Sequence, residues 1–149
     1  MLKYAIIPHI YLSFFRRLKS LFLNVTNHKS STWQQKQINA ANVYGEIVDY
    51  PYPQLHPSYT TDDIARISRE ELTKILAMKP TACLVAGEWT LTFQLVDGLL
   101  RAGVKVLASC SERKTVEQKN PDGSLTKTAH FDFVQFREYE YFRRADREK

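Results

Sequence analysis

The feature that most constrains this chain is a short apolar segment that runs directly into a polar turn and then into a helical pattern. The apolar segment covers residues 21–25, the turn covers residues 26–31, and the helical pattern begins at Thr32. In a parallel α/β sheet, the first strand-to-helix connection presents unpaired backbone N–H groups at the positive end of a helix dipole. The sequence therefore predicts an anion-binding turn, in which Asn27, His28 and Lys29 can hold an oxyanion and transfer a proton.

Length and charge narrow the class of protein. A chain of 149 residues with 44% hydrophobic content predicts one compact domain with a real core. A net charge of +5 favours acidic partners, yet the Lys and Arg residues are not patterned densely enough to predict binding to duplex DNA. Cys83 lies in an apolar run and Cys110 in a polar turn, and their spacing matches neither a CxxC pair nor a cluster with His. We interpret both as reduced thiols of a cytoplasmic protein.

The first twenty residues differ from the rest of the chain. They carry four basic residues and no acidic one, and most of the charge follows the apolar part, which is unlike a secretory signal. The apolar run is also shorter than the roughly 20 residues that span a bilayer. Two interpretations remain open: a basic amphipathic segment that contacts a membrane surface or a partner, and a poorly ordered extension. We favour the second and place a single domain at residues 21–149.

From residue 21 onward, strand and helix patterns alternate. We expect strands at 21–25, 46–49, 81–86 and 104–108, and helices at 32–43, 61–78 and from about Thr90 to Gly103. Three prolines between residues 51 and 57 predict an extended loop. Residues 113–119 and 124–137 then alternate around the turn Asn120-Pro121-Asp122-Gly123, which predicts a β-hairpin. The expected fold is a Rossmann-like, three-layer α/β sandwich with a mostly parallel sheet and a C-terminal hairpin, followed by a tail that forms a strand end or a short helix.

Ligands in open α/β sheets bind beyond the carboxyl ends of the strands. Polar residues follow the first, third and fourth expected strands, and we expect these connections to converge on one edge. The ligand-contacting candidates are Asn27, His28, Lys29, Ser30 and Ser31 in the first, Gly87, Glu88, Trp89 and Thr90 in the second, and Ser109, Ser111, Glu112 and Arg113 in the third.

Each candidate also has a purely structural interpretation. Asn27 or the two serines can cap the first helix, Thr90 can cap the third, and Trp89 can belong to the core. Glu112 and Arg113 can form a surface ion pair. The four histidines are scattered along the sequence, and we expect neither a metal site nor a cofactor.

Four short stretches together resemble the small, stand-alone CARF-like proteins of type III CRISPR systems. They are residues 24–28 with Trp33 and Gln37, residues 87–93, residues 108–113 and residues 133–139. The resemblance implies a Rossmann-like domain that binds a cyclic oligoadenylate, with cyclic tetra-adenylate as the expected ring, and that in ring-nuclease members cleaves it.

On this resemblance the catalytic residues are His28, Lys29 and Arg113. His28 is the general base, Lys29 and the Ser30 and Ser31 N–H groups hold a phosphate, and Arg113 stabilises developing charge. Glu112 orients Arg113 or contacts an adenine edge, and Trp89 stacks on a base. A ring with internal symmetry predicts a homodimeric receptor. Two other functions stay open: a non-catalytic sensor or sponge for the same ligand, and an unrelated nucleotide- or protein-binding module whose contact surface is Arg143, Arg144 and the basic N-terminus.

Overall fold

The computed structural model describes residues 20–142, so the expectations for the N-terminal extension and for the far end of the tail lie outside the described residues. The elements in chain order are β1 (Leu21–Thr26), the 3-10 turn η2 (Ser30–Thr32), α1 (Gln35–Asn42), β2 (Glu46–Pro51), α2 (Thr61–Ala77), β3 (Ala82–Ala86), α3 (Trp89–Arg101), β4 (Lys105–Lys119) and β5 (Leu125–Glu138).

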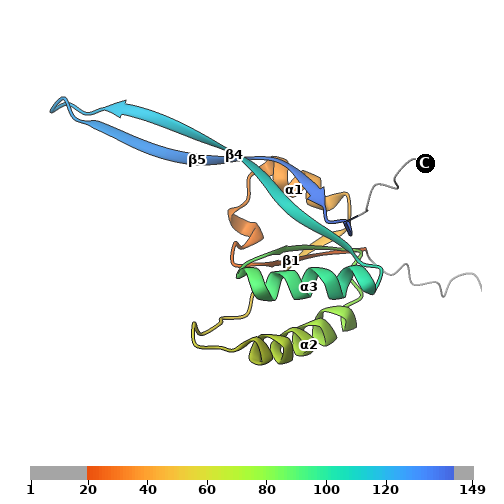
Figure 1. Cartoon of the computed structure of the whole chain (residues 1–149). Helices are drawn as coiled ribbons and strands as arrows, with labels where there is room; N and C mark the ends of the chain where they lie inside the picture. The colour runs from red at the N-terminus through yellow and green to blue at the C-terminus, as the bar shows by residue number, and fades with distance from the viewer. Residues whose placement is uncertain (1–19, 143–149) are drawn as a thin grey trace, which may run out of the picture.

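The strands form one five-stranded sheet in the order β2-β1-β3-β4-β5. The first four strands are parallel, and β5 runs antiparallel to β4. Helices α2 and α3 cover one face of the sheet and α1 covers the other (Figure 1). The expected α/β fold class, with its layers and its C-terminal hairpin, is therefore confirmed.

Two apolar clusters hold the layers together. The larger lies between the sheet and helices α2 and α3, with Leu23, Cys83 and Leu99 fully buried in it. The smaller lies under α1 and centres on Phe22 and Leu84. Because the side chains of β1 and β3 alternate between two covered faces, both strands are almost continuously apolar, as expected for the interior of a parallel sheet.

The start of α2 is fixed by a capping interaction between two residues that are close in the sequence. Thr60 caps the helix, with its side chain accepting a hydrogen bond from the Asp63 N–H while the Asp63 carboxylate accepts one from the Thr60 N–H. This reciprocal capping box satisfies two backbone donors that a helix start otherwise leaves unpaired. The prediction of a helix from residue 61 is confirmed.

Three sequence-based expectations were wrong. The expected helix from Thr32 is interrupted, because η2 ends at Thr32 and α1 starts only at Gln35. The cap of α3 is Glu88 and not Thr90, since the Glu88 carboxylate accepts the Leu91 N–H. There is also no connection after a fourth strand ending at Ala108: β4 runs on to Lys119 because β5 pairs with it all along, with one bulge between Cys110 and Ser111.

The far part of the β4–β5 hairpin extends away from the body of the molecule (Figure 1). We call the stretch from Glu112 to Asp132 the arm. At the base of the arm, Gln34 acts on the outer edge of β5: its side-chain oxygen accepts the Phe133 N–H at 3.0 Å, and its side-chain nitrogen donates to the Phe131 carbonyl at 3.5 Å. One glutamine thus takes the place of a further strand there.

Candidate functional site

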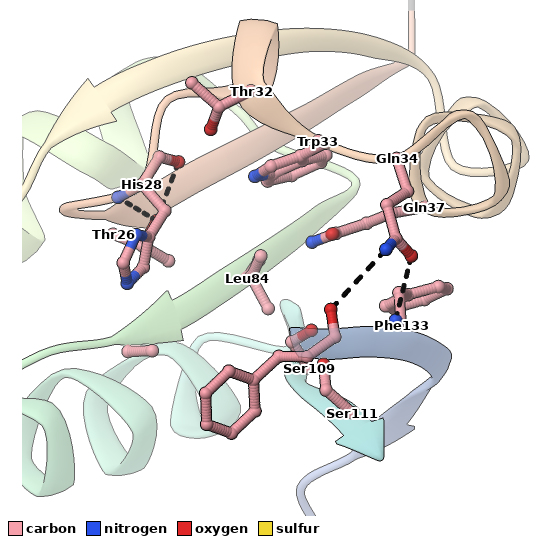
Figure 2. A pocket seen from close by; sticks show the side chains of 12 residues that line it. Thr26, His28, Thr32, Trp33, Gln34, Gln37, Leu84, Ser109, Ser111 and Phe133 are labelled. Carbon is pink, nitrogen blue, oxygen red and sulfur yellow. Dashed lines mark hydrogen bonds between the residues drawn. The ribbon is translucent and has the colours of Figure 1, made fainter. Parts of the chain in front are cut away.

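A cavity of ≈ 510 Å³ lies where β1 and β3 end, between the η2–α1 connection and the base of the hairpin (Figure 2). The chain leaves β1 toward α1 on one face and leaves β3 toward α3 on the other, so the cavity lies at the topological switch point of the sheet. The lining residues are Thr26, His28, Thr32, Trp33, Gln34, Gln37, Leu84, Ala86, Ser109, Ser111, Phe131 and Phe133.

The lining combines aromatic rings, hydroxyl groups and the nitrogen-bearing side chains of one histidine and two glutamines. Trp33, Phe131 and Phe133 supply aromatic rings, while hydroxyl groups come from β1, η2 and β4. Figure 2 shows the His28 imidazole at one end of the cavity and Gln34 with Phe133 at the other, with Gln37 reaching between them. The volume is within the range of about 300–1,000 Å³ typical of small-molecule sites.

The backbone of His28 is anchored on both sides. Its N–H donates to the Thr26 hydroxyl at 3.1 Å, and its carbonyl accepts from the Asn24 side chain at 2.8 Å and from the Thr26 hydroxyl at 3.2 Å. Asn24 is only 1% exposed, and apart from Thr26 the other residues of β1 are apolar. These bonds fix the turn after β1, and with it the point from which the imidazole enters the cavity.

Asp49, near the end of β2, extends this network. Its carboxylate accepts a hydrogen bond from the Asn24 side chain at 2.7 Å, from the Ser30 N–H at 3.0 Å and from the Ser30 hydroxyl at 3.0 Å. Burial by itself would raise the pKa of Asp49, but the hydrogen bonds from Asn24 and Ser30, with the nearby Lys29 charge, lower it below its ordinary value. The Ser30 N–H, expected to hold a phosphate, already binds this carboxylate.

The structure brings together only part of the predicted site. Of the first connection, His28 lines the cavity, and Ser109 and Ser111 join it from β4. Asn27 and Lys29 line a smaller cavity of ≈ 160 Å³ beside Asp49, which shares Thr26 with the larger one. Ser31 belongs to η2 and lines neither of the two.

Arg113 and Glu112 lie at the start of the arm. Arg113 follows Ser111 on the same face of β4 and pairs in register with Phe131, but it is not part of the cavity lining. Glu112 lies on the opposite face, where its carboxylate is 3.8 Å from Lys114, whose ammonium group also binds Asp132 at 2.7 Å. The expected pairing of Glu112 with Arg113 is replaced by this cluster.

The connection after β3 does not reach the cavity. Gly87 packs against the Tyr52 ring, and the Thr90 hydroxyl donates to the Glu88 carboxylate. Trp89, which is 86% exposed, lines a separate groove of ≈ 350 Å³ with Phe93 and residues 139–142. The four predicted residues of this connection are therefore absent from the cavity lining, and Trp89 belongs neither to the cavity nor to the core.

Several lining residues were not among the predicted site residues. Thr26 is the first residue of the predicted turn, Thr32 and Gln34 follow that turn, and Phe131 and Phe133 come from a strand far away in the sequence. One signal was readable: an Asn inside a buried apolar strand needs hydrogen-bond partners. It pointed to Asn24, and the structure supplies Asp49 and His28 as the partners.

Fold and site define a Rossmann-like α/β protein with a ligand-sized cavity at its switch point. The chain belongs to the uncharacterized protein MJ1673 family, which matches residues 20–137 and so includes both the cavity and the arm. No curated protein and no solved structure matches the chain. Within residues 20–142, no helix is long and apolar enough to cross a membrane.

Proposed function

We propose that this protein is a cytoplasmic enzyme of type III CRISPR defence that binds a cyclic oligoadenylate, with cyclic tetra-adenylate as the first candidate, and opens the ring. The resemblance to small CARF-like ring nucleases suggests the ligand. The observation that carries the proposal is the position of the His28 imidazole in a nucleotide-sized cavity at the switch point.

The lining suits a purine base. Trp33, Phe131 and Phe133 offer rings on which a base can stack, at roughly 1–3 kcal/mol per stacked base. Gln37 carries an amide of the kind that pairs with the N6 and N7 positions of adenine. Because Gln34 is occupied by the hairpin backbone, Gln37 is the amide we assign to base recognition.

The proposed reaction is an internal transfer. His28 accepts the proton of a ribose 2′-OH, the 2′-oxygen forms a bond to the adjacent phosphorus, and the bond from phosphorus to the 5′-oxygen breaks. The 5′-oxygen takes up a proton from the solvent. The product is a linear oligonucleotide with a 2′,3′-cyclic phosphate and a 5′-OH, and the reaction consumes no water. A positioned base of this kind contributes about 10²–10⁴ in rate.

Positive charge for the phosphates has to come from the rim. Lys29 lines the smaller cavity, which shares Thr26 with the larger one, and Arg113 lies two residues after Ser111 on the arm. We assign Lys29 to phosphate holding and Arg113 to stabilisation of developing charge. Two such sites related by a twofold axis would match the symmetry of a four-membered ring, which supports a homodimeric receptor.

The test is incubation of the purified protein with labelled cyclic tetra-adenylate in the presence of EDTA, with binding and product formation measured on the same samples. We expect a linear product with a 2′,3′-cyclic phosphate. His28→Ala should reduce turnover about 10²-fold or more with little change in affinity. His56→Ala is the matched control, because His56 lies in the proline-rich loop and bonds to Ser58. Equal turnover in the two variants would remove His28 from the reaction.

Binding without cleavage is the second candidate. Within the described residues, the cavity lining contains no Lys or Arg. Such a lining favours base recognition over stabilisation of a charged transition state. Affinity for the ring without any product in wild-type protein would assign a sponge or sensor role.

A further inference from the structure

The arm has almost nothing to pack against in a single copy of the chain. Beyond the bulge, nearly every residue of both strands is exposed, including Leu125 at 60% and Phe131 at 65%. An isolated two-stranded hairpin is marginally stable at best in water. A hairpin of this length with exposed apolar side chains is a surface on which a partner strand can add stability.

The hydrogen bonds of β5 show which of its residues point their backbone N–H and C=O groups away from β4. At the tip, the Asn120 N–H donates to the Ser124 carbonyl at 2.8 Å, so even-numbered positions in this part of β5 direct their backbone groups toward β4. At the base, the Phe133 N–H and the Phe131 carbonyl bond to Gln34 on the other side. The hydrogen bonds at the tip and at the base therefore both indicate that the odd-numbered residues of β5 direct their backbone groups outward. Within residues 20–142, no strand pairs with this edge.

We propose that the outer edge of β5 in the arm pairs antiparallel with the same edge of a second copy, about a twofold axis at Thr128. An axis perpendicular to the sheet preserves its faces, so paired residue numbers must differ by an even number. With the axis at Thr128, Leu125 of one copy lies opposite Phe131 of the other, and Lys127 lies opposite Ala129. These outward-pointing pairs exchange backbone hydrogen bonds.

Complementarity selects this register. An axis at Lys127 places the two Lys127 side chains directly opposite each other, which is unfavourable. An axis at Ala129 places Leu125 opposite Phe133, whose N–H is already bound by Gln34. The register at Thr128 joins Leu125 and Phe131, the two large exposed apolar side chains that β5 contributes to the arm, and opposes no like charges. The mixed charges of the arm, already paired as Lys114–Asp132 and Lys127–Glu117, also suit a copy of itself better than a polyanion.

The pairing has a consequence for the cavity. Phe131 lines the cavity and is the residue opposite Leu125 of the second copy. The tip of the second arm then ends next to the Gln34 contact with Phe133. Each copy would thereby support one wall of the other's cavity. The two cavities lie at opposite ends of the paired arms, roughly 33 Å apart, so this interface is distinct from a receptor in which one ring contacts two sites, and it requires no ligand.

Two matched proline variants test the edge. Ala129→Pro removes an outward N–H of β5, and Thr115→Pro removes an outward N–H at its register partner on β4. By sedimentation without ligand, we expect a wild-type dimer, a Thr115→Pro dimer, and an Ala129→Pro dimer weakened roughly tenfold or more, since two symmetry-related pairs are disrupted. A monomeric wild-type protein, or loss of the dimer in Thr115→Pro alone, would overturn the proposal.

A disulfide crosslink tests which residues of the two copies lie opposite each other. It also decides whether the β5 edge forms the interface if both proline variants lose the dimer. In a Cys110→Ser background, Thr128→Cys places two thiols at a non-hydrogen-bonded pair on the axis, where Cα atoms are about 4.5 Å apart. Oxidation should crosslink this variant to itself and leave Thr126→Cys uncrosslinked. Crosslinking of Thr126→Cys instead, or of neither variant, contradicts the proposed pairing. Because no ligand is added, these results are independent of ring binding and cleavage.

Discussion

The contact between Asp49 and Asn24 gives the sharpest test of how the His28 turn is held. Asp49→Ala removes one of the two acceptors of the Asn24 side-chain amide; the other, the His28 carbonyl, remains, and Asn24 itself is 1% exposed. A buried donor left unsatisfied costs about 1–3 kcal/mol. The bonds from Ser30 are at an exposed position, so water replaces them and they add little. We therefore expect a loss of about 2 kcal/mol in the free energy of unfolding.

The assay is urea unfolding of Asp49→Ala, Asn24→Ala and the double variant, with Glu70→Ala as the control. Glu70 pairs with Arg66 on the surface of α2 at 3.1 Å, and its loss should cost no more than about 0.5 kcal/mol. Because Asn24 and Asp49 share one hydrogen bond, the double variant should lose less than the sum of the single losses, by about 1–2 kcal/mol. Additive losses would refute the view that these residues act as one unit.

The same comparison has a pH dependence. The pKa of Asp49 is lowered in the native state, so its contribution is fully present above the ordinary value of 3.8 and is lost as the pH falls through the lower native pKa. The stability difference between wild type and Asp49→Ala should be constant between pH 7 and pH 5 and should shrink below pH 3.8. A difference that grows toward low pH would contradict this assignment.

Three further outcomes are expected. Gly87→Ala should lose roughly 1–3 kcal/mol of stability in urea unfolding, because a Cβ there would lie 2.4 Å from the buried Tyr52 ring; an unchanged midpoint would show that the ring can move. Gln34→Ala should speed hydrogen exchange of the Phe133 amide several-fold, while amides in β1 stay protected. Burial raises the pKa of the Cys83 thiol to about 12, so a thiol reagent at pH 8 should label only the other, partly exposed cysteine until urea is added.

The sequence predicted those elements whose signals are local. The capping residues of α2 and the unbroken apolar run of β3 each lie within a few neighbouring positions, and both elements were confirmed. The alternating pattern around the Asn120–Gly123 turn likewise predicted the hairpin. In these segments local propensity and tertiary structure favour the same conformation.

The errors concern features that depend on distant partners. Whether residues 109–112 form a turn or a strand is decided by pairing with residues 132–136, and the local sequence is polar enough for either. The sequence placed the start of α3 two residues too late and Trp89 in the turn before it. In the structure Trp89 is the first residue of the helix and lines a surface groove. The Asn24–Asp49 contact depends on the register between β1 and β2, which no local pattern encodes.

The bulge between Cys110 and Ser111 separates two parts of β4 that tolerate sequence change differently. On the core side, a single inserted residue would turn buried side chains such as Leu107 toward the wrong layer. On the arm side, removing two residues from each strand preserves which side chains of the remaining arm face each way, and Ser111 and Phe133 at its base keep their places in the cavity lining. Natural variation in arm length among relatives should therefore occur in steps of two residues per strand, and single-residue insertions should be confined to the turn.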